Sequence, residues 1–261
     1  MKNLMMNKIP AVIFTVLLSI FTATNLRSQQ PSLSGKIMDN DINSVKEMIA
    51  AGADINKKDS NGYTSLMTAC HYNRLEIAKL LVSAGAELNV QEKSYGYTPL
   101  ILACQYKYHD LAKYLISKGA DINIQGKEGA TALMAAASNS REIVELLLSK
   151  GADVNARMTD GTGVFAQCIT GIYWDSVPIE LAETLLAKGA DVDEAATTGS
   201  SEGFTPLMLA ATNNLEDLAR FLIKNGANVN ATAKDGKTPL SIATKEGYNN
   251  IVEILKANGA K

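Results

Sequence analysis

One short motif recurs along almost the whole chain and constrains its fold more than any other feature. Seven apolar segments end in Gly-Ala, and six of these continue as an Asp, Glu or Asn, an apolar residue and a final Asn or Asp. The glycines are Gly52, Gly85, Gly119, Gly151, Gly189, Gly226 and Gly259. They are 33, 34, 32, 38, 37 and 33 residues apart, and a period in the low thirties is typical of one helix pair plus a turn. The repeat therefore predicts a stack of helical units.

A single unit shows why each stretch would fold into two short helices. Thr98 and Pro99 suit a helix start, because threonine accepts from free first-turn amides and proline needs no amide partner there. Residues 100–104 place small apolar side chains on one side. After a break, residues 111–116 repeat the three-and-four spacing of an amphipathic helix. Gly119 ends this second helix, because the left-handed cap conformation costs glycine least.

The same start recurs in other units and carries a family resemblance. Its copies read Gly62-Tyr-Thr-Ser-Leu, Gly129-Ala-Thr-Ala-Leu, Gly203-Phe-Thr-Pro-Leu and Gly236-Lys-Thr-Pro-Leu. With the Gly-Ala-Asp-Val-Asn end, this start resembles the ankyrin repeat over about residues 32 to 261. The resemblance implies an all-α repeat solenoid in which each unit is a β-hairpin followed by two helices. An N-terminal capping unit, at about residues 32–56, and about six further units are expected.

The first 28 residues differ from the rest of the chain. Lys2 and Lys8 give a positive start, and residues 9–23 form a run of 15 without charge. This order is typical of a secretory signal peptide, and the run is shorter than the roughly 20 residues of a spanning helix. The alternative is an uncleaved N-terminal anchor. We predict a signal peptide at residues 1–28, an ankyrin repeat domain at residues 29–261, and export to the periplasm or the secreted space.

Charge argues against nucleic acid as a partner. The chain has a formal net charge of −2, and removing Lys2, Lys8 and Arg27 with the signal leaves 22 basic against 27 acidic residues. A mildly acidic chain lacks the basic footprint that DNA and RNA require. The expected partner is a protein, with no membrane association of the mature form unless the signal is uncleaved. Export and an Asn-, Lys- and Ile-rich composition favour a bacterial source.

The unit at about residues 160–202 breaks the pattern. It starts Gly161-Thr-Gly-Val-Phe, so the threonine cap and the proline are missing and Gly163 weakens the helix start. The segment between its helices, residues 171–178, is about five residues longer than elsewhere, and the hairpin at residues 192–202 is about four longer. A binding loop is expected at such insertions, and Trp174 lies in the first. The alternative is a degenerate repeat, because loops tolerate insertion at low cost.

Aromatic residues collect where the family resemblance places partner contacts. That resemblance implies binding at the hairpin tips and the exposed side of each first helix, the concave face. The predicted binding residues are Tyr63, Tyr72, Tyr97, Tyr106, Tyr173, Trp174 and Phe204. Tyrosine and tryptophan are enriched among binding hot spots. The alternative is that these rings only shield the grooves between units.

Few residues in the chain could carry out chemistry. Cys70, Cys104 and Cys168 are odd in number and occupy nearly equivalent first-helix positions, so we expect core residues rather than disulfides. His71 and His109 lack partners at metal-ligand spacing. The sequence has no nucleophile elbow, phosphate loop or dinucleotide fingerprint. We therefore predict no catalytic residues, no metal site and no cofactor.

These observations favour one function and leave one alternative. The favoured function is a non-catalytic interaction scaffold of the cell envelope or secreted space that binds a partner protein through the concave face and hairpin tips. A sharper form is an inhibitor, immunity protein or protective partner of an enzyme. The alternative is a secreted host-interaction effector that uses the same module. An enzyme is the least supported class, because no set of suitable residues converges.

Overall fold

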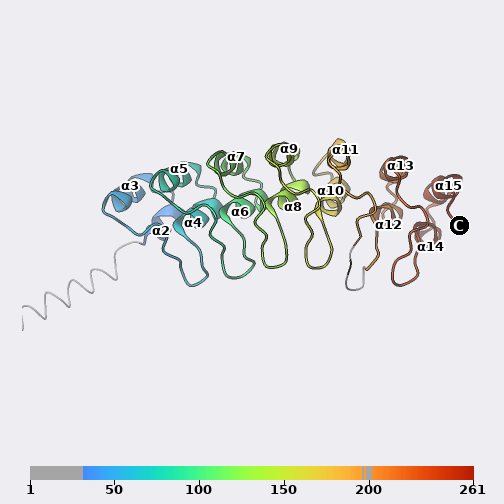
Figure 1. Ribbon diagram of the computed structural model, residues 1–261, viewed down its shortest axis with the longest axis horizontal. Helices are drawn as coiled ribbons and strands as arrows, with labels where there is room; N and C mark the ends of the chain where they lie inside the picture. The colour runs from blue at the N-terminus through green and yellow to red at the C-terminus, as the bar shows by residue number, and fades with distance from the viewer. Residues whose placement is uncertain (1–31, 196, 198–201) are drawn as a thin grey trace, which may run out of the picture.

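The computed structural model describes residues 32–195, 197 and 202–261, so the predicted signal peptide at residues 1–28 lies outside the described residues. Within these ranges, fourteen helices form seven successive pairs. The pairs stack side by side, so that the helices form two rows. Long loops extend from one side of the stack (Figure 1). The predicted all-α repeat solenoid is confirmed. Across this part of the chain, no helix has the length and apolar character needed to span a membrane.

The first helices of the pairs form the row next to the long loops. They are α2 (Leu33–Met38), α4 (Ser65–His71), α6 (Pro99–Gln105), α8 (Ala132–Ala137), α10 (Val164–Tyr173), α12 (Pro206–Thr212) and α14 (Pro239–Glu246). The second helices form the outer row. They are α3 (Ile42–Ala50), α5 (Leu75–Ser83), α7 (His109–Ser117), α9 (Arg141–Ser149), α11 (Glu180–Ala187), α13 (Glu216–Lys224) and α15 (Asn249–Ala257). Each unit buries its apolar residues against its neighbours in one continuous core.

Threonine caps begin five of the seven first helices, as the repeated motif predicts. Each hydroxyl accepts a hydrogen bond from the amide three residues later, at 3.2–3.4 Å. The capping residues are Thr64, Thr98, Thr131, Thr205 and Thr238. Proline follows the cap in α6, α12 and α14, where its missing amide leaves no helix bond unmade.

The long loops have the shape of hairpins but form almost no β ladder. The described residues contain a single β-bridge, between Arg157 and Gly163. The hairpins are instead held to one another by backbone hydrogen bonds of 2.8–2.9 Å. These bonds run from Lys93 to Asn61, Lys127 to Tyr95, Thr159 to Glu128, Thr197 to Asp160 and Lys234 to Glu202. The predicted β-hairpins are therefore turns that the stack of units orders.

Asparagine side chains also join the units at the turns that follow the second helices. Asn56 Oδ1 accepts from Glu87 N at 2.9 Å, and its Nδ2 donates to Gly85 O at 3.3 Å. Asn123 and Asn230 make the same pair of bonds to the units that follow them. The stacking register is thus fixed both by the hairpins and by these turns.

The irregular unit differs from its predicted form in one respect. The segment predicted to connect its two helices starts inside the first of them, because α10 has 10 residues and runs to Tyr173, with Trp174 as its C-cap. Gly171 is buried in this extension, and a Cβ there would lie 2.8 Å from the Cα and carbonyl oxygen of Ser138. The extra turn of α10 therefore depends on a close approach to the end of α8.

Stacking is weakest between the fifth and sixth pairs, which we call the junction. Here α10 and α12 contact each other less than any other two neighbouring first helices. A cavity of about 190 Å³ lies between them. Its walls include Ala166 and Ile169 of α10 and Pro206 and Leu209 around α12.

Candidate functional site

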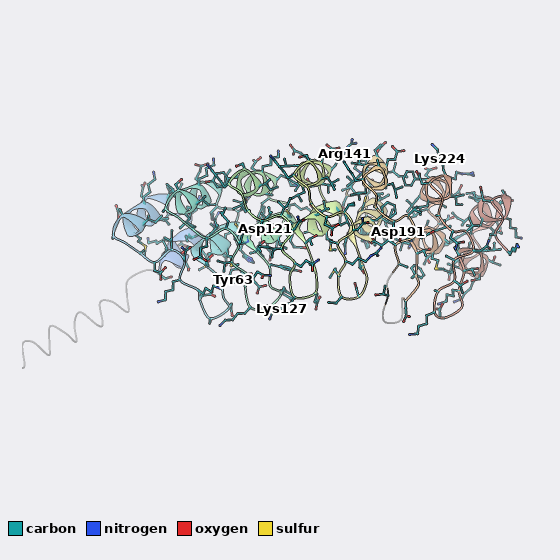
Figure 2. The ribbon with its side chains drawn as sticks, viewed as in Figure 1. Tyr63, Asp121, Lys127, Arg141, Asp191 and Lys224 are labelled. Carbon is teal, nitrogen blue, oxygen red and sulfur yellow. The ribbon has the colours of Figure 1, made fainter. Side chains whose placement is uncertain are left out.

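A cavity lined by aromatic and acidic residues opens on the first-helix row near the N-terminal end of the described structure. We call it the N-terminal groove, and its volume is about 450 Å³. Its walls come from α2, the first two hairpins and the end of α4. The main lining residues are Met38, Asp59, Tyr63, His71, Tyr72, Glu92 and Tyr95. Tyr63 lies on the hairpin side of the row (Figure 2). Because three successive units supply the walls, the groove exists only in the stacked array.

His71 is the centre of the aromatic cluster. Its ring centroid lies 5.0 Å from that of Tyr72, 5.0 Å from that of Tyr106 and 6.1 Å from that of Tyr63, edge to face each time. Tyr72 and Tyr106 are the C-caps of α4 and α6, so the repeat brings the same helix position together from two units. His71 Nδ1 is buried and has no hydrogen-bond partner among the described residues.

Several of these rings face solvent. The exposed fraction is 42% for Tyr72, 41% for Tyr106 and 60% for Tyr95. Tyr95 stacks on Tyr97 with 5.4 Å between ring centroids. Tyr63 and Tyr97 are half-buried against the core, and burial raises the pKa of both phenols, with smaller contributions from nearby acidic groups. Tyr63 and Tyr97 therefore pack against the core, while the other three tyrosines remain accessible to a partner.

Two carboxylates lie in the walls of the groove. Asp59 Oδ1 accepts from the amides of Asn61 and Tyr63, each at 2.8 Å. Glu92 is 4% exposed and accepts from backbone amides of its own hairpin, including that of Tyr95 at 2.7 Å. Burial raises the pKa of Glu92, but these donors lower it by more, so the net pKa lies below the ordinary value. The groove is negatively charged, and no lysine or arginine is among the described residues that line it.

A second aromatic pair lies at the end of α10. The ring centroids of Tyr173 and Trp174 are 4.8 Å apart, and the exposed fractions are 36% and 68%. Phe204 is half-buried and lines the cavity at the junction. These three residues come from the irregular unit and the hairpin after it.

Comparison with known proteins accounts for the fold. Residues 33–126 and 175–261 match the family described as ankyrin repeats (3 copies), and residues 128–159 match the ankyrin repeat. The chain belongs to the ankyrin repeat family. All of these matches are to ankyrin repeats, which are generally non-catalytic protein-interaction modules.

Individual relatives share the ankyrin repeats at low identity or over short stretches. The ankyrin repeat protein YahD of Escherichia coli (strain K12) is 25% identical over 227 residues, which covers 84% of this chain and 92% of YahD. XBAT35 of Arabidopsis thaliana, named as an E3 ubiquitin-protein ligase, is 47% identical over 62 residues, and the match spans 23% of this chain but only 13% of XBAT35. The crystal structure of the human ASB11 ankyrin repeat domain has a TM-score of 0.72 at 24% identity, covering 88% of this chain and 98% of that one.

On the ankyrin solenoid, the seven predicted binding residues do not form one band. Tyr63, Tyr72 and Tyr106 meet at His71, and Tyr97 lies in the second hairpin against Tyr95. Tyr173 and Trp174 form a separate pair, and Phe204 lies apart from both groups. The binding role of all seven stays a prediction.

Three residues that complete the groove, Tyr95, Asp59 and Glu92, were not predicted from the sequence. One signal was present for Tyr95: Gly96 follows Gly85 by eleven residues, whereas Gly62 follows Gly52 by ten. The second hairpin is thus one residue longer, and Tyr95 lies in its tip. The two carboxylates have ordinary turn positions in the sequence, so only the stacking of hairpins reveals that they share one cavity.

The junction contains a buried carboxylate at a position, five residues after the capping glycine, where four of the five other repeats carry an apolar side chain and the first carries Lys57. Glu194 is 2% exposed, and its counterparts Val90 and Ala156 are also buried. Glu194 Oε1 accepts from Gly163 N at 2.7 Å and Ala166 N at 3.0 Å, at the start of α10. Burial raises the pKa of Glu194 despite these bonds and the Arg157 guanidinium, whose Nη1 lies 3.8 Å from Oε2. This side chain therefore replaces the threonine cap that α10 lacks.

The cysteines belong to the core of the repeats. All three are free and buried, and burial raises the pKa of the Cys104 and Cys168 thiols to about 12 and that of Cys70 as well. Within the described ranges, no cluster of three His, Cys, Asp or Glu side chains could hold a metal ion.

Proposed function

We propose that this ankyrin repeat chain is a non-catalytic scaffold that binds a partner protein through the N-terminal groove and the hairpin tips around it. The observation that carries this proposal is the set of exposed tyrosines around His71. Binding hot spots are enriched in Tyr and Trp gathered in such concavities. A single exposed aromatic residue needs no explanation, but a cluster that rims a cavity does.

The rings of the groove are also held in place before any partner arrives. Tyr72 and Tyr106 contact the same His71 ring, and Tyr95 stacks on the half-buried Tyr97. Because rigid aromatic side chains have few rotamers to lose, they supply contact area at low entropic cost. This favours the groove over the Tyr173–Trp174 pair, in which Trp174 is 68% exposed.

For the biological setting, we propose an exported protein of the periplasm or secreted space that inhibits or protects a partner enzyme there. The support is the order of a charged start and an apolar run in residues 1–28. Cell fractionation tests this setting: recovery in the envelope fraction is expected. Recovery in host cells instead would favour a secreted host-interaction effector.

The test of the binding function is affinity capture with a C-terminal tag on the full chain, using two matched double variants. Tyr72→Ala with Tyr106→Ala removes the rings beside His71, whereas Tyr173→Ala with Trp174→Ala removes the other exposed pair. We expect one stoichiometric partner, lost in the first variant and kept in the second. Thermal unfolding checks that both variants stay folded. Retention of the same partner by both variants would contradict the proposal.

A further inference from the structure

We infer that the N-terminal groove receives an arginine side chain of the partner protein, stacked on the tyrosine rings and paired with Asp59. The inference rests on the proposed function and adds the chemistry of the partner. It follows from two features of the groove: its exposed ring faces and its carboxylates, one of which has an oxygen without a protein donor among the described residues.

The rings provide a surface that a flat cation can cover. Tyr72 and Tyr95 line the same cavity and are 42% and 60% exposed. A guanidinium stacks on aromatic faces and is held there by the ring quadrupole. Met38, which is 38% exposed in the same wall, can contact the apolar stem of the arginine.

The neighbouring cations are bound elsewhere and do not line the cavity. Lys36 Nζ is paired with Asp41 at 2.8 Å, and Lys93 Nζ donates to the Ser60 carbonyl at 3.2 Å. The Arg74 guanidinium donates to the Met38 carbonyl at 2.6 Å. Both amides that Asp59 binds meet its Oδ1, so Oδ2 has no protein donor among the described residues. A cation in the groove would therefore meet a carboxylate oxygen that is ready to accept.

The exposed rings and the carboxylate together favour arginine over a simpler cation. A guanidinium has five N–H donors in a fixed plane, whereas a lysine ammonium is a compact point charge. One guanidinium can donate to Asp59 Oδ2 while its face covers a tyrosine.

The test compares two capped peptides that differ in charge alone. Acetyl-Gly-Gly-Arg-Gly-Gly-amide and the same peptide with citrulline are titrated into the purified chain, and NMR follows the ring signals of His71, Tyr72 and Tyr95. We expect the arginine peptide to shift these signals and the citrulline peptide to bind at least about tenfold more weakly, because citrulline has lost the charge that both the rings and the carboxylate attract.

Two isosteric variants separate the groove from general charge. Asp59→Asn keeps an oxygen for the amides of Asn61 and Tyr63 but removes the negative charge. Asp121→Asn makes the same change in the turn after α7, where Asp121 accepts from Asn123 N at 3.0 Å. We expect Asp59→Asn to weaken arginine-peptide binding about five- to tenfold and Asp121→Asn to leave it unchanged.

Two outcomes would overturn the inference: equal affinity for the arginine and citrulline peptides, or equal affinity of Asp59→Asn and Asp121→Asn for the arginine peptide. These failures are distinct from failure of the proposed function. If the tyrosine variants still lose their captured partner, the groove binds a partner of different chemistry. If the arginine peptide binds through Asp59 but no partner is captured, the proposed binding of a partner protein is wrong. The arginine site in the groove would still be supported.

Discussion

Glu194 shows at the scale of single residues how a side chain from the next unit can replace a lost helix cap. Its carboxylate binds two amides at the start of α10, where Gly163 offers no side chain. The carboxylate is 2% exposed, so its charge is buried at a cost. The two hydrogen bonds offset part of that cost. Without them, the amides of Gly163 and Ala166 at the start of α10 would be buried with no acceptor.

Removing this cap should destabilise the protein measurably. We expect Glu194→Ala to lower the free energy of unfolding by about 1–3 kcal/mol, since it loses a helix cap and leaves buried amides without an acceptor. Glu194→Gln keeps one acceptor oxygen and should lose less than half as much. Urea denaturation measures both values. An Ala variant no less stable than the Gln variant would show that the two bonds contribute nothing.

The titration of Glu194 should also leave a signature in stability. Because its pKa is raised in the folded state, the folded chain binds this proton more tightly than the unfolded chain does. Unfolding free energy must therefore fall as pH rises from the ordinary carboxyl pKa of about 4.3 through the raised value. Glu194→Gln lacks this titration, so the wild type should lose stability relative to that variant as the pH rises above about 4. A difference that stays constant, or changes in the opposite direction, contradicts the assigned pKa shift.

Residue-level features differ in how far the sequence predicts them. The threonine caps are predictable because cap and amide lie three residues apart within one motif. Glu194 is not, since its partner Gly163 lies 31 residues away and the contact depends on stacking. The exposed Tyr95 was missed for a similar reason: its neighbours in the groove come from other units.

At the scale of elements, α10 departs most from its equivalents. The longer sequence after residue 171 was expected to form a loop, but its first residues continue the helix to Tyr173. The extension is possible because Gly171 allows α10 to approach Ser138 at the end of α8. A repeat pattern predicts that two helices are present but does not predict where an inserted residue changes from loop to helix.

This close approach gives a prediction with a matched control in another helix. Gly171→Ala should destabilise by about 1–3 kcal/mol, because its Cβ would lie 2.8 Å from Ser138 backbone atoms. Among the described residues, the new Cβ of Gly35→Ala in α2 would meet only the Ser32 hydroxyl, at 3.3 Å, so this variant should be neutral or stabilised by up to about 1 kcal/mol through helix propensity. Thermal and urea unfolding distinguish the two. Equal effects would mean that α8 and α10 can separate without cost.

At the scale of the whole molecule, the junction should divide the solenoid into two cooperative parts. Repeat stability is a sum of unit and interface terms, and the interface between α10 and α12 is weaker than its equivalents. We expect hydrogen exchange to show amides of α12–α15 opening together, with a lower free energy than those of α4–α8. A single opening free energy for all helices would contradict this division.

The overall shape and the binding surface were not equally predictable. The repeat period specified the paired helices and their stacking, because each unit repeats the same local chemistry. The seven aromatic residues predicted to bind form two clusters and one isolated ring, because only Tyr63, Tyr72 and Tyr106 meet at one histidine. The sequence predicts which rings lie at the helix ends, but not which rings touch.

The central claim is that the N-terminal groove is the surface that binds a partner. Photocrosslinking in the source cells tests it most directly, with a benzoylphenylalanine placed at Tyr72, at Trp174, and at Arg141 or Lys224 on the outer row (Figure 2). The account predicts one discrete crosslinked species from position 72 and none from positions 141 and 224. Crosslinks from position 174 or the outer row, with none from position 72, would contradict it.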